Sequence, residues 1–340
     1  MVILLTPMIQ RVLTSIVRIA ATLIVIVGLL WLLLARPAIS FKDVSKVSPR
    51  LVNSVALKKH TLMLSEDLSP RDYWHTDNLN KVANYIAESL RSSGARVNEQ
   101  LFEVNGTEYK NVIAEYGPQD RELIIIGAHY DAEGENPGAD DNASGVAGLL
   151  EIGRLLGEIQ LKTRVALVAF TLEEPPFFQT ENMGSTVYAK SLAETGTTVK
   201  LMIALEMIGY FSDEKGSQDY PMTLLNLYYP SIGNYIAVVD KMQSTQAQRM
   251  KASMAQVIDF PVYSINAPTF IPGVDFSDHR SFWRYGYPAV MVTDTAFYRN
   301  NAYHEEDDRA ERLNYEMMGQ VVYGVYDYVL KLSEEIDNSR

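Results

Sequence analysis

The sequence predicts one α/β domain with a central mixed, mostly parallel sheet flanked by helices, preceded by an N-terminal transmembrane helix. Short apolar runs of strand length alternate with amphipathic runs of helical spacing from residue 79 to residue 333. The chain has 340 residues and no internal repeat, and this alternation runs through it without a break. We therefore divide it into a cytoplasmic tail and membrane anchor over 1–36, a connector over 37–70 and the folded domain over 71–335.

The predicted anchor is an uncharged apolar run over 19–35, with Arg11 and Arg18 before it and Arg36 after it. At about 1.5 Å per residue it spans roughly 25 Å, near the short end of the range for a transmembrane helix. A cleaved signal peptide is the alternative, but no small-x-small cleavage site follows the run. We expect an uncleaved, single-pass signal anchor. Basic residues flank both ends, so we take the usual orientation, with the bulk of the chain extracytoplasmic, in the periplasm or at the cell surface.

Composition narrows the chemistry. The formal net charge is −12 and Lys and Arg form no cluster, which argues against a nucleic-acid partner. The chain has no Cys, which excludes disulfides, thiolate metal sites and a Cys nucleophile, and which fits a bacterial envelope protein. With only five His, a metal site would have to depend on carboxylates.

The domain begins with regular elements. Apolar residues at helical spacing over 79–90 predict an amphipathic helix that ends at Ser93-Gly94. Two strands over 99–104 and 111–116 flank Asn105-Gly106, the signature of a hairpin turn.

The stretch over 123–156 organises the rest of the chain. An apolar run over 123–126 predicts a buried strand, and His129 and Asp131 follow it directly. Asp141 stands where the next helical pattern begins. A His and two carboxylates thus follow the carboxyl end of a strand, the edge at which α/β sheets build their sites.

Further carboxylates and a His follow later elements. A buried strand over 164–172 ends in Glu173-Glu174, and the apolar segment over 200–210 contains one carboxylate, Glu206. A carboxylate in so apolar a run is costly unless it is paired or bound to a metal. Residues 259–276 are rich in Pro, Phe and Tyr and predict a long loop over the site. A last strand over 288–293 precedes His304 and the closing helix.

Together these residues predict a metal centre. The candidate ligands are His129, Asp141, Glu174, Glu206 and His304. Two His with several carboxylates suit zinc, and Mn²⁺ or Co²⁺ would also be tolerated. Five ligands are too many for one catalytic zinc that keeps a water position, but they suit two ions that share a bridging carboxylate. Asp131, two residues after His129, can hold the other imidazole nitrogen.

The motifs occur in the order of a known family. The segments GAHYDA, PGADDNASG, TLEE, MGS, ALEMIG, SDHRSF and YHEEDD, within about residues 70 to 333, resemble the zinc-dependent exopeptidase family twenty-eight. That family includes bacterial leucyl-type aminopeptidases, with glutaminyl cyclases and glutamate carboxypeptidases as relatives. The resemblance implies a zinc-exopeptidase fold of the phosphorylase/hydrolase-like kind.

The resemblance also implies a role for each residue. Asp141 resembles the bridging carboxylate, with Asp140 its non-ligand neighbour. His129 and Glu206 would complete one metal site, and Glu174 and His304 the other. Glu173 would be the general base that passes a proton from water to the leaving amine. Tyr303 resembles a residue that hydrogen-bonds the tetrahedral oxyanion in some relatives.

Two positions depart from the family pattern. The ligand at Glu206 is often Asp in the family, and the longer side chain can still reach a metal. Some secreted relatives place an oxyanion-binding Tyr where this chain has Val274. That role then passes to Tyr303 or to His279, and His279 can equally be a packed structural residue beside Trp283.

The sequence therefore predicts a membrane-anchored, two-zinc aminopeptidase that removes N-terminal residues from peptides. Three alternatives stay open. A glutaminyl cyclase would use one zinc for an intramolecular transfer. A carboxypeptidase would need a basic pocket, for which Arg280, Arg284 and Arg299 are available. A catalytically inactive receptor-like module would be expected to lose ligands. Side-chain preference and oligomeric state stay open as well.

Overall fold

The computed structural model describes residues 7–34, 52–119 and 122–338, and an eight-stranded mixed sheet forms its centre. The strand order is β1-β2-β4-β3-β5-β8-β6-β7. The strands are β1 (Arg96–Val104), β2 (Thr107–Tyr116), β3 (Leu123–His129), β4 (Arg164–Phe170), β5 (Val199–Glu206), β6 (Ile236–Lys241), β7 (Val262–Ala267) and β8 (Ala289–Thr293). The central strands β4, β3, β5 and β8 run parallel. At one side β2 is antiparallel to β4 and to β1. At the other side β6 is antiparallel to β8 and parallel to β7. The predicted fold class is confirmed.

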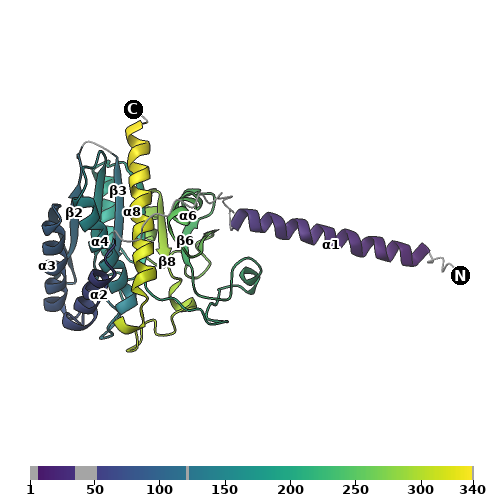
Figure 1. The fold of residues 1–340 in the computed structure, drawn as a ribbon, viewed down its shortest axis with the longest axis horizontal. Helices are drawn as coiled ribbons and strands as arrows, with labels where there is room; N and C mark the ends of the chain where they lie inside the picture. The colour runs from purple at the N-terminus through teal and green to yellow at the C-terminus, as the bar shows by residue number, and fades with distance from the viewer. Residues whose placement is uncertain (1–6, 35–51, 120–121, 339–340) are drawn as a thin grey trace.

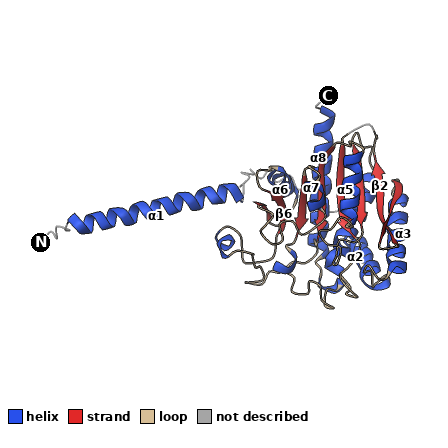
Figure 2. Ribbon diagram, turned by 180° about the vertical axis from the view of Figure 1, so that it is seen from behind, coloured by secondary structure: helices blue, strands red, loops and turns tan. Residues whose placement is uncertain are grey.

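Helices cover both faces of this sheet (Figure 1, Figure 2). They are α2 (Ser54–Leu62), α3 (Thr76–Ser92), α4 (Gly145–Gly157), α5 (Gly184–Glu194), α6 (Gln246–Val257), α7 (His279–Arg284) and α8 (Tyr315–Asn338). Successive strand residues point to opposite faces. Ile124 and Ile126 therefore pack in the cluster with α3, α4 and α8, while Leu123 and Ile125 pack in the cluster with α5 and α7.

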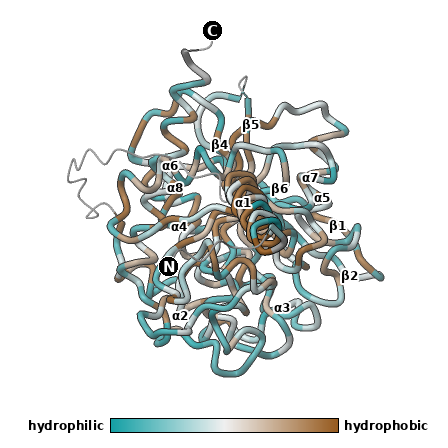
Figure 3. Tube along the Cα trace, turned by 90° about the vertical axis from the view of Figure 1, so that its right-hand side faces the viewer, coloured by the Kyte–Doolittle hydropathy of each residue, from teal (hydrophilic) through white to brown (hydrophobic). Residues whose placement is uncertain are grey.

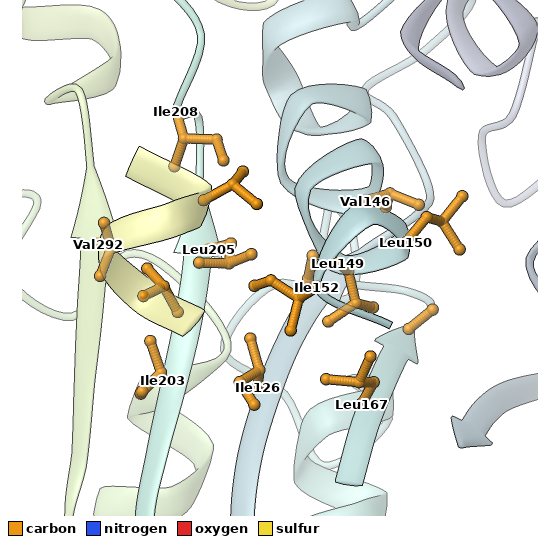
Figure 4. Packing of buried hydrophobic residues seen from close by; sticks show 14 of the residues in the cluster. Ile126, Val146, Leu149, Leu150, Ile152, Leu167, Ile203, Leu205, Ile208 and Val292 are labelled. Atoms are coloured by element: carbon orange, nitrogen blue, oxygen red, sulfur yellow. The ribbon is translucent and has the colours of Figure 1, made fainter. Parts of the chain in front are cut away.

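The core under α4 sets the position of the loop before it. Leu149 and Ile152 of α4 lie over Ile126 and Leu167 of the central strands (Figure 4). At the start of α4, a Cβ on Gly145 would lie 2.6 Å from the carbonyl oxygen of Leu205. Only glycine permits this approach. The loop that precedes α4 is thereby held against the carboxyl end of β5.

The N-terminal part contains a long exposed helix and a shorter packed one. Helix α1 (Pro7–Leu34) projects from the domain (Figure 1), and Ile9–Leu33 has a mean hydropathy of 2.6. Among the described residues it is the one helix long and apolar enough to cross a membrane, and a signal sequence would meet the same description. Residues 1–6 of the predicted tail and residues 35–51, which cover the anchor's end and residues 37–51 of the connector, lie outside the described residues.

Two expectations about the elements differ from the structure, and the pairing of strands decides a third segment. The predicted connector contains α2, which packs on α4 and α8 through the fully buried Leu57. The predicted loop over 259–276 contains the edge strand β7, whose residues alternate between buried and half-buried. The apolar run over 235–239 is compatible with a helix or a strand, and Ile236–Lys241 forms β6 because it pairs with β7 and β8. Short apolar runs do not separate helix from strand without such partners.

Candidate metal centre

The carboxyl ends of neighbouring parallel strands converge on one group of ionisable side chains. β3 ends at His129 and β5 ends at Glu206, while Glu173 and Glu174 follow the end of β4 by three and four residues. All four side chains are almost fully buried, with exposed fractions from 1% to 6%. Parallel pairing of β4, β3 and β5 brings these strand ends to the same edge of the sheet.

Asp141 lies between two imidazoles. It comes from the short helical turn η3 (Ala139–Ser144), and its Oδ1 lies 3.3 Å from Nε2 of His129. Its Oδ2 lies 3.2 Å from Nε2 of His304. Glu206 approaches the same nitrogen of His129 at 3.4 Å, and Glu174 approaches that of His304 at 3.2 Å. The predicted ligands thus form two three-residue groups that share the Asp141 carboxylate.

These separations fit a divalent metal. Two donors on one tetrahedral zinc, each about 2.0–2.2 Å from the ion, stand about 3.3–3.5 Å apart. Oε1 of Glu174 is buried and finds no hydrogen-bond partner among the described residues. Buried polar atoms of this kind normally have a partner. His129, Asp141 and Glu174 also offer donor atoms that all lie within 4.8 Å of one another.

The loop that carries Asp141 is held from several sides. Nδ2 of Asn142 donates to the carbonyl oxygen of Leu205 at 2.8 Å. The carboxylate of Asp308 accepts from the backbone N–H of Asp141 at 3.0 Å. Arg71 is fully buried, and its guanidinium donates to the carbonyl oxygens of Tyr130 and Leu64 at 3.0 Å and to those of Pro137 and Gly138. These contacts preorganise the Asp141 carboxylate.

Two residues hold the candidate ligands from behind. The backbone carbonyl oxygen of Asp131 lies 3.2 Å from Nδ1 of His129, and its Oδ1 lies 3.7 Å from the same nitrogen. Its Oδ2 accepts from the backbone N–H of Glu174 at 3.1 Å. Asp131 therefore links one residue of each metal group. The hydroxyl of Ser277 donates to Oε2 of Glu206 at 2.7 Å, which fixes the longer side chain at that position.

Burial and crowding shift the pKa values of the cluster in the metal-free chain. Burial raises the pKa of Glu173 well above its usual range, His129 opposes this, and Glu206 adds to it. Burial, reinforced by Asp141 and opposed by His304, raises the pKa of Glu174 to about 8. Burial alone would lower the pKa of His304, but the contacts with Asp141 and Glu174 outweigh it and raise the pKa to about 10. The cluster therefore holds protons that a cation would replace.

Tyr303 and His279 occupy different kinds of position. The ring of Tyr303 stacks on His304 with centroids 3.8 Å apart, and it faces the cavity beside the cluster. His279 is fully buried, and its Nε2 lies 2.9 Å from the carbonyl oxygen of Val274. Its ring meets Trp283 edge-on. His279 is thus packed as a structural residue, which leaves Tyr303 as the candidate for binding an oxyanion.

A cavity of about 110 Å³ opens beside the cluster. Glu206 and Tyr303 contribute to its wall, and the rest of the wall is mainly apolar and aromatic. Its lining includes Tyr220, Leu225, Tyr229, Tyr235, Tyr263, Ile265, Ile271, Val274, Phe276 and Met291. Residues 259–276, predicted as a loop over the site, contribute only part of the cavity wall, because Tyr220, Leu225 and Tyr229 come from the segment between β5 and β6.

Comparison with known proteins decides the family. Peptidase family M28 matches residues 111–329. The chain belongs to peptidase family M28. This M28 chain is 52% identical over 287 residues to the uncharacterised protein YfbL of Escherichia coli K12, covering 82% of this chain and 88% of that one. It is 25% identical over 299 residues to a probable leucine aminopeptidase of Arthroderma otae, covering 82% and 73%. The resemblance predicted from the motifs is confirmed.

Solved structures share the fold of this M28 chain. The zinc aminopeptidase BSAP of Bacillus subtilis superposes with a TM-score of 0.66 at 16% identity, covering 83% of this chain and 95% of that one. The glutaminyl cyclase of Porphyromonas gingivalis superposes with a TM-score of 0.61 at 21% identity, covering 83% and 99%. At such identities the likeness shows the fold alone, and two chemistries occur on it.

Three supporting residues were not predicted from the sequence. No sequence pattern indicated a role for Arg71, because a single Arg before a helix is common in proteins. Ser277 stands in the Ser-Asp-His motif, which pointed to the neighbourhood but not to the contact with Glu206. Asp308 ends the acidic run after His304, where the only visible cue was charge.

Proposed function

We propose that this chain is a membrane-anchored aminopeptidase that holds two zinc ions and hydrolyses N-terminal residues from peptides. Membership in M28 and relatives described as leucine aminopeptidases and zinc metalloproteases support a zinc peptidase. One observation supports the proposal of two metal ions: the Asp141 carboxylate presents one oxygen to His129 and the other to His304.

The donor set would divide between two ions. His129 and Glu206 would hold one ion, Glu174 and His304 the other, and Asp141 both. Zn²⁺ suits these N and O donors, and Mn²⁺ or Co²⁺ would be tolerated. When bound, such a pair polarises the scissile carbonyl and lowers the pKa of the attacking water.

The remaining residues would handle protons and charge. Glu173 accepts a proton from the attacking water and passes it to the leaving amine, a task suited to a buried carboxyl group with a raised pKa. Tyr303 donates a hydrogen bond to the developing oxyanion, and burial keeps its hydroxyl protonated by raising its pKa. Asp131 orients His129 through the hydrogen bond between Nδ1 and its backbone carbonyl oxygen, with its carboxylate nearby.

The cavity supports a preference for apolar N-terminal residues. It lies beside Glu206 and Tyr303, and its walls are mainly aromatic and aliphatic. A large apolar side chain would exclude water there and gain free energy by burial. We therefore infer a preference for substrates with Leu, Met or Phe at the N-terminus over those with charged residues.

The alternative activities find less support. A carboxypeptidase needs a free cation for the substrate carboxylate, yet Arg280 pairs with Asp275 and Arg284 pairs with Glu181. Arg299 is buried and donates to the side chain of Gln218. A glutaminyl cyclase with one zinc would leave part of this donor set unused. An inactive module would not be expected to keep all five candidate ligands.

The test is metal content measured beside hydrolysis. The full chain, purified in detergent, is analysed for zinc by mass spectrometry and assayed on a panel of aminoacyl anilides. We expect two zinc ions per chain, hydrolysis that a chelator abolishes, and loss of both with Asp141→Asn. One zinc per chain and conversion of N-terminal Gln with release of ammonia would favour the cyclase instead. No bound metal would overturn the ligand assignment.

A further inference from the structure

The segment between β5 and β6 forms a projection whose outer part has no charged residue. We call residues 211–235 the η4 lobe, after its short helical turn η4 (Thr223–Leu227). From Tyr220 to Pro230 the lobe contains no Lys, Arg, Asp or Glu. Leu227 and Met222 are 68% and 46% exposed. Leu225 and Tyr229 of the same stretch are buried, so the lobe has a packed apolar interior and two large apolar side chains on its surface. Exposed apolar side chains that lie together mark a surface that meets a partner or a membrane.

The lobe touches α1. The hydroxyl of Tyr228 donates to the carbonyl oxygen of Val27 at 2.9 Å, and the edge strand β7 also contacts α1. Figure 1 and Figure 2 show the lobe extending from the domain in the direction of α1, and Figure 3 looks along α1 onto the same side of the domain. The lobe and the helix therefore share one side of the molecule.

The position of this contact along α1 indicates how deep in a bilayer the lobe would lie. Val27 lies six residues inside Leu33, the end of the apolar span. At about 1.5 Å per residue, that is about 9 Å below the end of the span. If α1 crosses a bilayer, the lobe reaches through the interface to the outer part of the acyl chains. Tyr side chains are favoured at the interface through which the lobe would pass, and exposed Leu and Met side chains gain free energy by insertion below it.

The charged residues of the lobe lie away from the part that would enter the bilayer. Asp213, Glu214, Lys215 and Asp219 all precede Tyr220 in the chain. They occupy the part of the lobe that leads from the sheet, whereas the uncharged part contacts α1. A charged tip would oppose insertion, and this tip has none.

The same lobe builds one wall of the cavity. Tyr220, Leu225 and Tyr229 line it, and the cavity continues to Glu206. Ile271 also lines the cavity, and its neighbour Phe270 is 82% exposed. We propose that the η4 lobe inserts into the outer part of the bilayer beside α1, so that the cavity receives N-termini presented at the membrane surface. The delivery of substrate rests on the proposed function; the insertion rests only on α1 as an anchor.

The insertion is tested by depth measurement. The chain has no Cys, so Leu227→Cys gives a single site for a fluorophore in the full chain. Leu101→Cys is the matched control, because Leu101 is 54% exposed on β1, at the opposite edge of the sheet from β7. In phosphatidylethanolamine/phosphatidylglycerol vesicles, lipids with a nitroxide at acyl carbon five should quench the label at Leu227 and not at Leu101.

Equal quenching at the two sites overturns the insertion. So does shielding of the Leu227 label by a second copy, seen as cross-linking between chains at this position. Either outcome is independent of whether the chain hydrolyses peptides.

The delivery of substrate is tested with two substrates. Leu227→Asp removes apolar character at a residue that does not line the cavity. We expect unchanged hydrolysis of a soluble leucyl anilide and about a tenfold loss on a peptide held in vesicles by a C-terminal acyl chain. Leu101→Asp should affect neither. Equal effects on both substrates overturn the delivery. A chain that hydrolyses neither substrate while Leu227 is quenched overturns the proposed function and supports the insertion.

Discussion

Asp140 and Asp141 are neighbours with opposite surroundings. Asp141 faces the two imidazoles, whereas Asp140 accepts from the backbone N–H of Gly209 at 3.0 Å and from Nδ2 of Asn300 at 3.1 Å. One carboxylate is placed to bind a cation and the other ties the loop to the segments after β5 and β8. Residue type and burial do not distinguish the roles of the two residues, since both are buried Asp. Their hydrogen-bond partners distinguish them.

Glu173 is the residue whose role can be separated from metal binding. Glu173→Gln keeps the size of the side chain and removes the proton acceptor. We expect full zinc content and a fall in kcat on a leucyl anilide of at least about 100-fold, within the range for general-base catalysis. Zinc analysis and kinetics on the same preparation check this. Retained turnover in a zinc-replete Glu173→Gln chain would exclude Glu173 as the general base.

His279 should make stability depend on pH. Burial, partly opposed by the hydrogen bond to Val274, lowers its pKa to about 4. The unfolded chain protonates this His below about pH 6.5, while the folded chain keeps it neutral down to about pH 4. Its contribution to stability is therefore full above pH 6.5 and is lost as the pH falls toward 4, by about 1.4 kcal/mol per unit.

The matched variant is His279→Gln, whose amide can keep the hydrogen bond to Val274. Denaturant unfolding of the chelator-treated chain would be measured at pH 7.5 and pH 5. We expect wild type to lose about 2 kcal/mol more than His279→Gln between these two values. Parallel losses in the two chains would show that His279 is accessible to protons in the folded state.

At the scale of elements, the site depends on how parallel strands align. β3 pairs with β4 on one side and with β5 on the other, and the three strand ends meet within one edge of the sheet. The loop before α4 then crosses this edge and supplies Asp141. Arg71 connects that loop to the turn after α2, since it donates to the carbonyl oxygens of Leu64 and Gly138.

Replacing Arg71 should disorder this connection. In Arg71→Met the side chain keeps its length but leaves several buried carbonyl oxygens without a donor. We expect a loss of at least about 3 kcal/mol in the free energy of unfolding, and weaker zinc binding because the loop of Asp141 is less well held. Arg91→Met, at the exposed end of α3, is the control and should change stability by less than about 0.5 kcal/mol. Equal stability of the two variants would contradict the role of Arg71.

At the scale of the whole molecule, the sequence predicted the features that depend on residues close together in the chain. The apolar runs that end at His129 and Glu206 predicted strands with ligand-type residues at their ends, and the structure brings these residues together. The sequence could not reveal which atoms face one another, because the distance between Asp141 and His304 depends on strand register and on loops far apart in the chain. The contact of Tyr228 with Val27 joins residues 201 positions apart, and no local pattern marks it. Long-range pairing also decided that 236–241 is a strand.

Metal binding should couple to the protonation of the whole cluster. In the metal-free chain the pKa of His304 is about 10 and that of Glu174 is about 8, both raised above their usual values. Both groups must lose their protons to bind zinc, so binding at pH 7 should release protons. Proton release should be smaller at pH 9, above the pKa of Glu174, and the apparent affinity for zinc should rise with pH until both groups are deprotonated.

Calorimetric titration in two buffers with different ionisation enthalpies, at pH 7 and pH 9, measures the number of protons released. Asp141→Asn, expected to bind little zinc, gives the background heat. Equal release at the two pH values would show that zinc does not displace the Glu174 proton, and the assignment of Glu174 as a ligand would fall.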